Sequence, residues 1–289
     1  MLSKDIAQSV TDKILASLEQ GVAPWVRPWK ADAGGMPYNL ASLKPYRGVN
    51  VPLLFCNSFT STAWITYKQA QSLGANVRKG EKGSMIVFYK PWKIEDKNNP
   101  DSEGKIVPVL KSYTVFNREQ IDGLDSLPAW HKDEESVRPS HEQANAVLSQ
   151  ADIRHGGARA FYRAEPDYIQ MPNAGDFTDM PSYYATALHE LTHWSGHKAR
   201  LAREYGKRFG DSAYAREELV AEMGAAFLCA HLGIDGRLQH ENYIGSWIKV
   251  LKEDKRAIIT AAGAAQKAAD YCLKVPAIAT DTEDESIAA

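Results

Sequence analysis

The segment His189-Glu190-Leu191-Thr192-His193 constrains this chain more than any other, because it has the pattern H-E-x-x-H. In a helix, residues four apart lie on the same face, so the two imidazoles can bind one metal ion together. Glu190 lies just beside that face, where its carboxylate can act as a general base toward a water molecule. The pattern therefore predicts a helical metal site with Glu190 as its catalytic residue.

The residues around this motif favour a helix. Ser182 follows Pro181 and is a suitable N-cap, and Gly196 is a suitable end. An apolar stripe runs along the segment at helical spacing: Tyr184, Leu188, Leu191 and Trp194. Taken alone, the same pattern also fits a surface helix with two solvated histidines, so a second observation has to decide.

A second expected helix, residues 213–232, carries Glu218 and Glu222, four apart and 25 residues after His193. A peptidase-type zinc site needs a third protein ligand, and a carboxylate from a second helix is a common source. We predict Glu218 as that ligand and Glu222 as the carboxylate that holds a ligand histidine from behind. Glu217 is a rival ligand, because the sequence does not say which side of this helix meets the motif.

The apolar surroundings of these glutamates indicate a largely buried helix: Leu219, Val220, Met223, Ala226 and Phe227. Buried carboxylates without a partner are costly, and a cation supplies the missing partner. Zn²⁺ is the expected ion, although two histidines and a glutamate can also take Mn²⁺ or Co²⁺. The activity that follows is that of a zinc-dependent metallopeptidase, with no indication of its substrate.

Composition bounds the class of protein. A chain of 289 residues predicts two domains. The sequence contains no run of 18 apolar residues, so we expect neither a membrane span nor a membrane partner. Residues 1–21 read as an amphipathic helix ending at Gly21. The three cysteines are too few and too scattered for a disulfide framework or a cysteine-based zinc site, so a reducing cytoplasm is the expected location.

Charge divides the chain into two halves. Residues 1–118 carry a net positive charge, and the remainder carries a larger net negative charge. Basic and aromatic residues alternate in the first half, which suits single-stranded DNA because rings stack on bases and cations neutralise phosphates. The alternative is that these aromatic residues belong to the core. The predicted DNA contacts are Trp25, Arg27, Trp29, Lys30, Tyr46, Arg47, Lys68, Arg78, Lys79 and Lys82, with Trp25, Trp29 and Tyr46 as stacking residues.

The expected fold class is α+β in two domains. We predict an α+β DNA-binding domain over residues 1–120, a linker over 121–139, a mainly helical domain with a small sheet over 140–275, and a disordered acidic tail over 276–289. The expected elements are a helix capped by Thr66, a hairpin of 85–90 with 107–117, a helix over 140–151, strands over 158–163 and 167–171, and helical structure over 241–273 broken near Gly263.

Several stretches resemble one known family. PWVRPW, YRGVN, WITYKQAQSLGANVRKGEKG and VFYKPW are similar to the single-stranded-DNA-binding domain of ArdC-type antirestriction proteins, which also begins some plasmid primases. YYATALHELTHWSGH and YAREELVAEMGAAFL are similar to the zincin-like metallopeptidase domain that follows it. The resemblance implies metal ligands at His189, His193 and Glu218, with Glu190 as the catalytic glutamate. It also implies a plasmid-borne role in shielding incoming DNA from host restriction.

Three hypotheses remain open at this stage. The first is an antirestriction factor that binds single-stranded DNA and whose peptidase site cuts a restriction component. The second is a non-enzymatic DNA-binding protein with a structural metal, and the third is a general metalloprotease whose basic half recruits acidic substrates. An oxyanion stabiliser is not identified, and the candidates are Tyr214, His231 and Tyr243; His197 is expected outside the ligand set.

Overall fold

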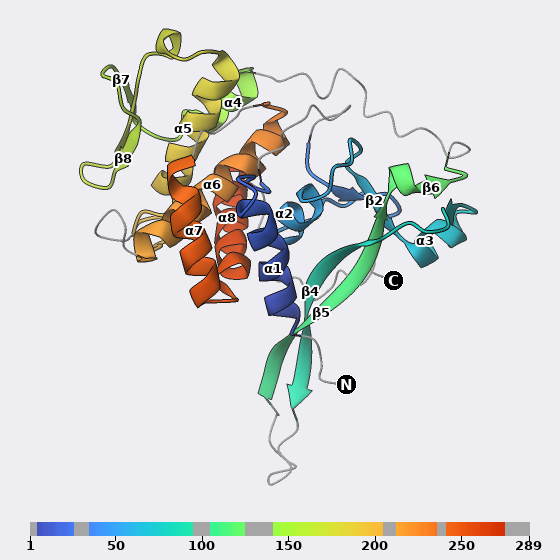
Figure 1. The fold of residues 1–289 in the computed structure, drawn as a ribbon. Helices are drawn as coiled ribbons and strands as arrows, with labels where there is room; N and C mark the ends of the chain where they lie inside the picture. Colours follow the sequence, from blue (N-terminus) through green and yellow to red (C-terminus); the bar gives the residue numbers. More distant parts are fainter. Residues whose placement is uncertain are drawn as a thin grey trace.

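The computed structural model describes residues 5–25, 35–94, 105–124, 141–204, 212–235 and 241–274. The predicted linker lies outside these residues beyond Leu124, as do the predicted tail and the start of the helix expected at residue 140. The described parts combine helices and strands in two halves, which confirms the α+β class (Figure 1).

The N-terminal half surrounds a four-stranded sheet of order β1-β2-β5-β4. β1 and β2 pair in parallel, whereas β2 with β5 and β5 with β4 pair antiparallel. A separate antiparallel pair joins β3 to β6. The elements are α1 (Ile6–Leu18), β1 (Tyr38–Asn39), α2 (Asn50–Phe55), β2 (Ala63–Thr66), α3 (Tyr67–Ser72), β3 (Asn76–Val77), β4 (Ser84–Ile94), β5 (Lys105–Asn117), the 3-10 turn Arg118–Gln120 and β6 (Ile121–Asp122).

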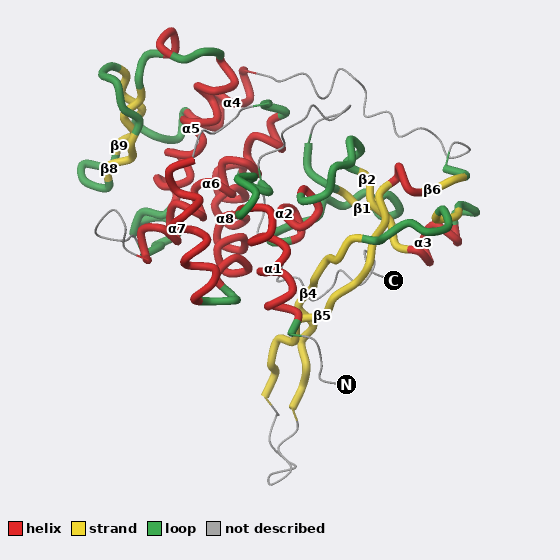
Figure 2. The backbone as a smooth tube through the Cα atoms, viewed as in Figure 1, coloured by secondary structure: helices red, strands yellow, loops and turns green. Residues whose placement is uncertain are grey.

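Local sequence explains two of these helices. The side chain of Asp5 caps α1 by accepting a hydrogen bond from the backbone nitrogen of Gln8 at 3.2 Å. Thr66 caps α3, as predicted, and Gln69 completes a reciprocal capping box. The predicted hairpin is also confirmed, since all of β4 pairs with residues 105–115 of β5, and the two strands extend from the body of the molecule as a ribbon (Figure 2).

The C-terminal half is mainly helical, with a three-stranded sheet of order β7-β9-β8 at one edge (Figure 1). Its central helix, α6, packs against α5, α7 and α8, which explains why this segment is apolar around most of its circumference. The elements are α4 (His141–Leu148), β7 (Ile153–His155), β8 (Phe161–Arg163), β9 (Tyr168–Met171), the 3-10 turn Ala174–Asp176, α5 (Met180–Ser195), α6 (Ser212–Leu232), α7 (Glu241–Glu253) and α8 (Ala257–Leu273).

Two sequence predictions need correction. The N-cap of α5 is Asp179, whose carboxylate accepts a hydrogen bond from the backbone nitrogen of Ser182, and Pro181 lies in the first turn. The helical segment 241–273 breaks between Glu253 and Ala257, whereas Gly263 lies inside α8. Ile121 and Asp122, the first two residues of the expected linker, form strand β6.

The two halves share one hydrophobic core rather than touching at a polar boundary. Val10, Ile14 and Leu18 of α1 belong to the same buried cluster as the C-terminal helices. Trp25 packs edge-to-face on Trp247 of α7, with ring centroids 5.3 Å apart. In Figure 1, α1 accordingly lies between the C-terminal helices and the β4–β5 ribbon.

Polar contacts also join the two halves. Thr11 donates a hydrogen bond to the carbonyl of Lys255 at 2.8 Å, and the backbone nitrogen of Gly48 donates to Gln266 at 3.0 Å. Arg47 forms an ion pair with Asp270 of α8. Among the described residues, no helix combines the length and apolar character needed to cross a membrane.

Candidate metal centre

The close approach of α5 and α6 brings the candidate ligands together. Gly224 of α6 faces Thr192 of α5, and a Cβ atom at residue 224 would lie 2.5 Å from Cγ2 of that threonine. Glycine is therefore required for the two helices to approach this closely. The predicted helix over the H-E-x-x-H motif is confirmed, and its C-cap is Gly196 as expected.

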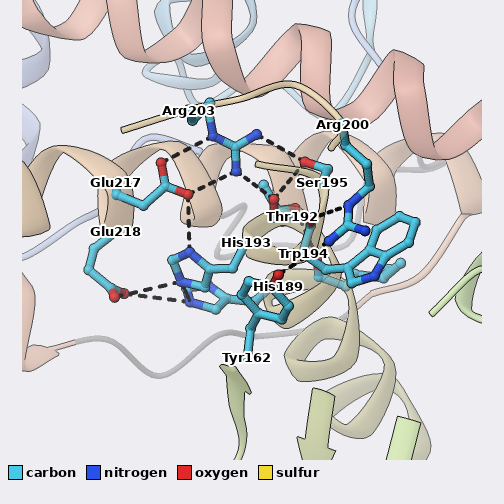
Figure 3. A network of polar contacts seen from close by, with 11 residues as sticks. Tyr162, His189, Thr192, His193, Trp194, Ser195, Arg200, Arg203, Glu217 and Glu218 are labelled. Carbon is cyan, nitrogen blue, oxygen red and sulfur yellow. Dashed lines mark hydrogen bonds and ion pairs between the residues drawn. The ribbon is translucent and has the colours of Figure 1, made fainter. Parts of the chain in front are cut away.

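His189, His193 and Glu218 converge on one point (Figure 3). The two Nε2 atoms are 3.1 Å apart, and each faces a carboxylate oxygen of Glu218, at 3.5 Å from His189 and 3.6 Å from His193. Four ligands around a tetrahedral zinc ion, with bonds of about 2.0–2.1 Å, lie about 3.3–3.4 Å from one another. The three observed separations fall around that value, so the donor set fits a divalent cation in both chemistry and spacing.

Two further glutamates lie behind the histidine rings. Oε1 of Glu222 is 3.4 Å from Nδ1 of His189, a position suited to a carboxylate that orients a ligand histidine. Oε1 of Glu217 is 3.2 Å from Nδ1 of His193. Glu217, the rival ligand, therefore faces the far side of its histidine, away from the point where the Nε2 atoms converge.

Arg203 holds the carboxylate of Glu217 in place by an ion pair. The sequence alone does not identify Arg203 as part of the site. Its guanidinium donates to both carboxylate oxygens of Glu217, at 2.8 and 3.1 Å, and to the carbonyl of Thr192 and the hydroxyl of Ser195 (Figure 3). The chain thus ties the end of α5 to α6 through a bidentate ion pair. Arg203 follows α5 in an irregular segment, where no periodic pattern marks it.

Burial and hydrogen bonding act in opposite directions on the charges here. Burial alone would lower the pKa of His189, but hydrogen bonds to Glu218 and Glu222 raise that pKa well above its ordinary value. Burial tends to raise the pKa of Glu218, yet its hydrogen bond with His189 and the charge of His193 lower the pKa to about 2. Glu218 is therefore held as a carboxylate, the form that binds a cation.

Glu190 is as buried as the three glutamates of α6 but differs from them in its contacts. Its side chain is only 7% exposed, and the described part of the chain provides no hydrogen bond or ion pair to its carboxylate. Glu217, Glu218 and Glu222 are equally buried, but each has a histidine partner. An ionised carboxylate in such a place needs a cation or a water molecule nearby.

Two tyrosines border the same centre. Tyr214 is hydrogen-bonded to Glu218, and its hydroxyl lies 3.3 Å from that of Tyr243. Burial and these contacts raise the pKa of Tyr214, so its phenol remains a donor. His231 is exposed at the far end of α6, and His197 is not part of the convergent set, as expected.

A second polar network braces the motif helix from the β8–β9 side (Figure 3). Arg200 donates to both oxygens of Asp167, at 2.6 and 2.9 Å, and its guanidinium lies 3.9 Å from the ring centroid of Trp194. Tyr162 donates to Asp167 at 2.7 Å. The small sheet is thereby fixed to the end of α5.

The predicted DNA contacts divide into three groups. Lys68, Lys79 and Lys82 are exposed on the N-terminal half, whereas Arg47 and Arg78 are engaged in ion pairs with Asp270 and Glu81. Trp25 and Tyr46 are 2% and 1% exposed, so the stacking roles predicted for them are corrected to core packing. Arg27, Trp29 and Lys30 lie outside the described residues.

Both halves match known domain families. Residues 4–116 match the profile of the N-terminal domain of anti-restriction factor ArdC, and residues 142–264 match that of a zincin-like metallopeptidase. The metal-free crystal structure of the antirestriction ArdC protein from the R388 plasmid is 41% identical, covers 94% of this chain and 97% of its own, and superposes with a TM-score of 0.78. This chain belongs to the ArdC antirestriction family.

Other members of this group extend the comparison. The Mn(II)-bound structure of the R388 ArdC protein has a TM-score of 0.76 at 41% identity, covering 94% of this chain and 98% of its own. An uncharacterized protein, y4eC, of Sinorhizobium fredii is 40% identical over 92% of this chain and 91% of its own length. DNA primase TraC of Escherichia coli is 39% identical over 94% of this chain, which spans only 27% of the primase. The two-domain architecture is thus shared with the R388 ArdC protein, and that relative has been crystallised with Mn(II) bound.

Proposed function

We propose that this protein binds single-stranded DNA through its N-terminal half and carries a metal-dependent peptidase site, and that together these protect incoming DNA from host restriction. The observation that carries the peptidase part is the convergence of His189, His193 and Glu218 beside Glu190, whose carboxylate has no hydrogen-bond or ion-pair partner within the described ranges. Zn²⁺ is the proposed ion, with Mn²⁺ and Co²⁺ as alternatives.

The proposed chemistry assigns each side chain a task. A bound divalent cation supplies Lewis acidity and lowers the pKa of water. His189, His193 and Glu218 hold it, while Glu222 and Glu217 keep the two imidazoles oriented. Glu190 takes the proton from the attacking water and passes it to the leaving amine. The candidate donors for a developing oxyanion are Tyr214, which is hydrogen-bonded to Glu218, and Tyr243, whose hydroxyl lies 3.3 Å from that of Tyr214.

The DNA part rests on the N-terminal half. Its exposed lysines fit a backbone contact with nucleic acid, and the relatives that share this half include proteins called antirestriction factors and primases. The three cysteines form no disulfide, which agrees with the cytoplasm as the place where incoming DNA would be met.

Replacing Glu190 by Gln separates the hypotheses. Unmodified plasmid DNA is transferred into restricting and non-restricting recipients that express either this protein or the variant, and survival of the DNA is compared. Our proposal expects protection by the wild type and its loss in Glu190→Gln, with metal content unchanged. The matched control is Glu142→Gln, an exposed glutamate at the start of α4. Full protection by Glu190→Gln would reject the peptidase role and leave DNA occupancy as the mechanism.

A further inference from the structure

We infer that Tyr67, at the start of α3, is a residue on which a base of single-stranded DNA stacks, with Lys68 and Lys82 contacting the adjacent phosphates. The inference rests on the proposed DNA binding and gives it a location. Tyr67 takes the stacking role that the sequence predicts for Trp25 and Tyr46, because the rings of those two residues lie in the core.

Exposure singles out three aromatic side chains in the described part of the molecule. Tyr67 is 49% exposed, Tyr89 is 42% exposed and Tyr271 is 38% exposed. A ring must present a face to solvent before a base can stack on it. Tyr67 has the largest exposed fraction of the three, and of the three it alone is next to an exposed lysine, Lys68, in the chain.

The scaffold holds Tyr67 in place. It is the first residue of α3, directly after the capping box of Thr66 and Gln69, so its backbone is held at the junction of β2 and α3. Its ring packs edge-on against Phe116 of β5, with centroids 6.5 Å apart and planes at 63°. An aromatic ring that is already ordered loses little conformational entropy when a base stacks on it.

Gly83 lets this aromatic pair sit close to the start of β4. A Cβ atom at residue 83 would lie 2.2 Å from Cγ2 of Thr114 and 3.1–3.2 Å from the ring of Phe116. The backbone of residue 83 therefore lies directly against Phe116, and Lys82 precedes this glycine in the chain. Lys68 follows Tyr67 in the chain, so the backbone brings two exposed lysines into the neighbourhood of the ring pair.

The charges around this ring leave its lysines available. Among the described residues, neither Lys68 nor Lys82 has an ion-pair partner. The nearby carboxylates are already engaged: Glu81 and Asp122 pair with Arg78, and Glu119 accepts hydrogen bonds from Thr60 and Ser61. Within the described ranges, this surface therefore combines an exposed aromatic ring with two lysines that have no ion-pair partner, which is the combination that single strands require.

The other two exposed tyrosines fit less well. Tyr271 follows Asp270 on α8 and packs against Trp194 in the acidic half, where a phosphate would meet negative charge. Tyr89 lies on the β4–β5 ribbon opposite Leu110, without a capped helix to fix its backbone. A duplex is also a poor occupant, because its bases are stacked on one another and leave no free face.

The test compares Tyr67→Ala with Tyr89→Ala and Tyr271→Ala in the full chain, using a fluorescent oligodeoxythymidylate and its anisotropy. We expect Tyr67→Ala to raise Kd by about tenfold and the other two by less than about twofold, because stacking contributes a large part of single-strand affinity. Tyr67→Phe keeps the ring and is expected to bind like the wild type. Equal affinity of Tyr67→Ala and wild type, or a larger loss in Tyr89→Ala, would overturn the inference.

Two further readouts separate a lost contact from a lost fold. The pair Lys68→Ala and Lys82→Ala is expected to lower the slope of log K against log salt by about 1.4, since each phosphate contact on a single strand contributes about 0.7. An oligonucleotide carrying bromodeoxyuridine is expected to crosslink to the wild-type peptide containing Tyr67. Crosslinking only to other peptides would overturn the assignment. If the wild type fails to bind single strands at all, the proposed DNA binding fails together with it, whereas binding that is indifferent to Tyr67 rejects this inference alone.

Discussion

Nδ1 of His193 lies 3.2 Å from Oε1 of Glu217, while Nε2 of the same ring faces Glu218 at 3.6 Å. Two adjacent glutamates of α6 thus hold opposite edges of one imidazole. We therefore propose Glu218 as a metal ligand and Glu217 as the group that orients His193.

The first prediction separates these two glutamates. Glu218→Gln removes a charged ligand and is expected to abolish tight Mn²⁺ binding in isothermal titration calorimetry. Glu217→Gln is expected to weaken binding by about 10- to 100-fold, which is the usual cost of losing a carboxylate behind a ligand histidine. Glu142→Gln serves as the control. The assignment is wrong if Glu217→Gln abolishes binding while Glu218→Gln retains it.

The second prediction concerns the contact between Gly224 and Thr192. Thr192 cannot turn away easily, because its hydroxyl donates to the carbonyl of Leu188 at 2.8 Å. Gly224→Ala should therefore destabilise the fold, since overpacking costs about 1–3 kcal/mol and exceeds the gain of roughly 1 kcal/mol in helix propensity.

A double-mutant cycle with Thr192→Ala checks this contact. In that background the hydroxyl and Cγ2 are gone and the nearest remaining atom, Cβ, is 3.3 Å away, so Gly224→Ala should become nearly neutral. Urea unfolding measures the four proteins. Purely additive effects would show that the two helices do not meet through these residues.

The third prediction is a pH dependence from Asp167. The hydrogen bonds from Arg200 lower the pKa of this carboxyl from 3.8 to about 2. Because the pKa is lower in the folded state than in the unfolded state, ionised Asp167 adds to the free energy of unfolding above pH 4. This contribution is lost as the pH falls toward 2.

Asp167→Asn is the matched variant, because asparagine tolerates the positive φ of 65° at this residue. The difference in unfolding free energy between wild type and variant should be largest above pH 4 and shrink between pH 4 and 2. A difference that stays constant across this range would contradict the ion pair with Arg200.

The fourth prediction follows from the core shared by the two halves. Trp25 is buried against Trp247, so Trp25→Ala should cost about 3–5 kcal/mol. Because the cluster spans both halves, calorimetry should show one unfolding transition that shifts as a whole. Two transitions, with only one of them shifted, would show that the halves fold independently.

The candidate site can be predicted from the sequence because its geometry is local. Residues four apart on a helix share a face, so the spacing predicts that His189 and His193 can bind one cation together, and that two carboxylates of the next helix, Glu218 and Glu222, lie on one face. The choice between Glu217 and Glu218 cannot be made in this way, because α6 is apolar on nearly all sides and its pattern does not mark the face that meets α5.

The sequence predictions are wrong where residues far away in the chain determine a residue's environment or a strand's pairing. Basic and aromatic neighbours make Trp25 and Tyr46 resemble DNA contacts, but Trp25 packs on Trp247, and Tyr46 lies in a cluster with Ile86 and Val115. Ile121 and Asp122 lie among residues typical of a linker, yet pair with β3, which lies far earlier in the chain. Long-range pairing of this kind leaves no periodic signal in a two-residue strand.

The central claim is that one divalent cation is held jointly by α5 and α6. Anomalous diffraction from crystals grown with Zn²⁺, or soaked with Mn²⁺, tests it directly. The account predicts one strong peak at about 2.0–2.2 Å from Nε2 of His189, Nε2 of His193 and a carboxylate oxygen of Glu218. A peak coordinated by Glu217 instead, or no peak between the two helices, would contradict it.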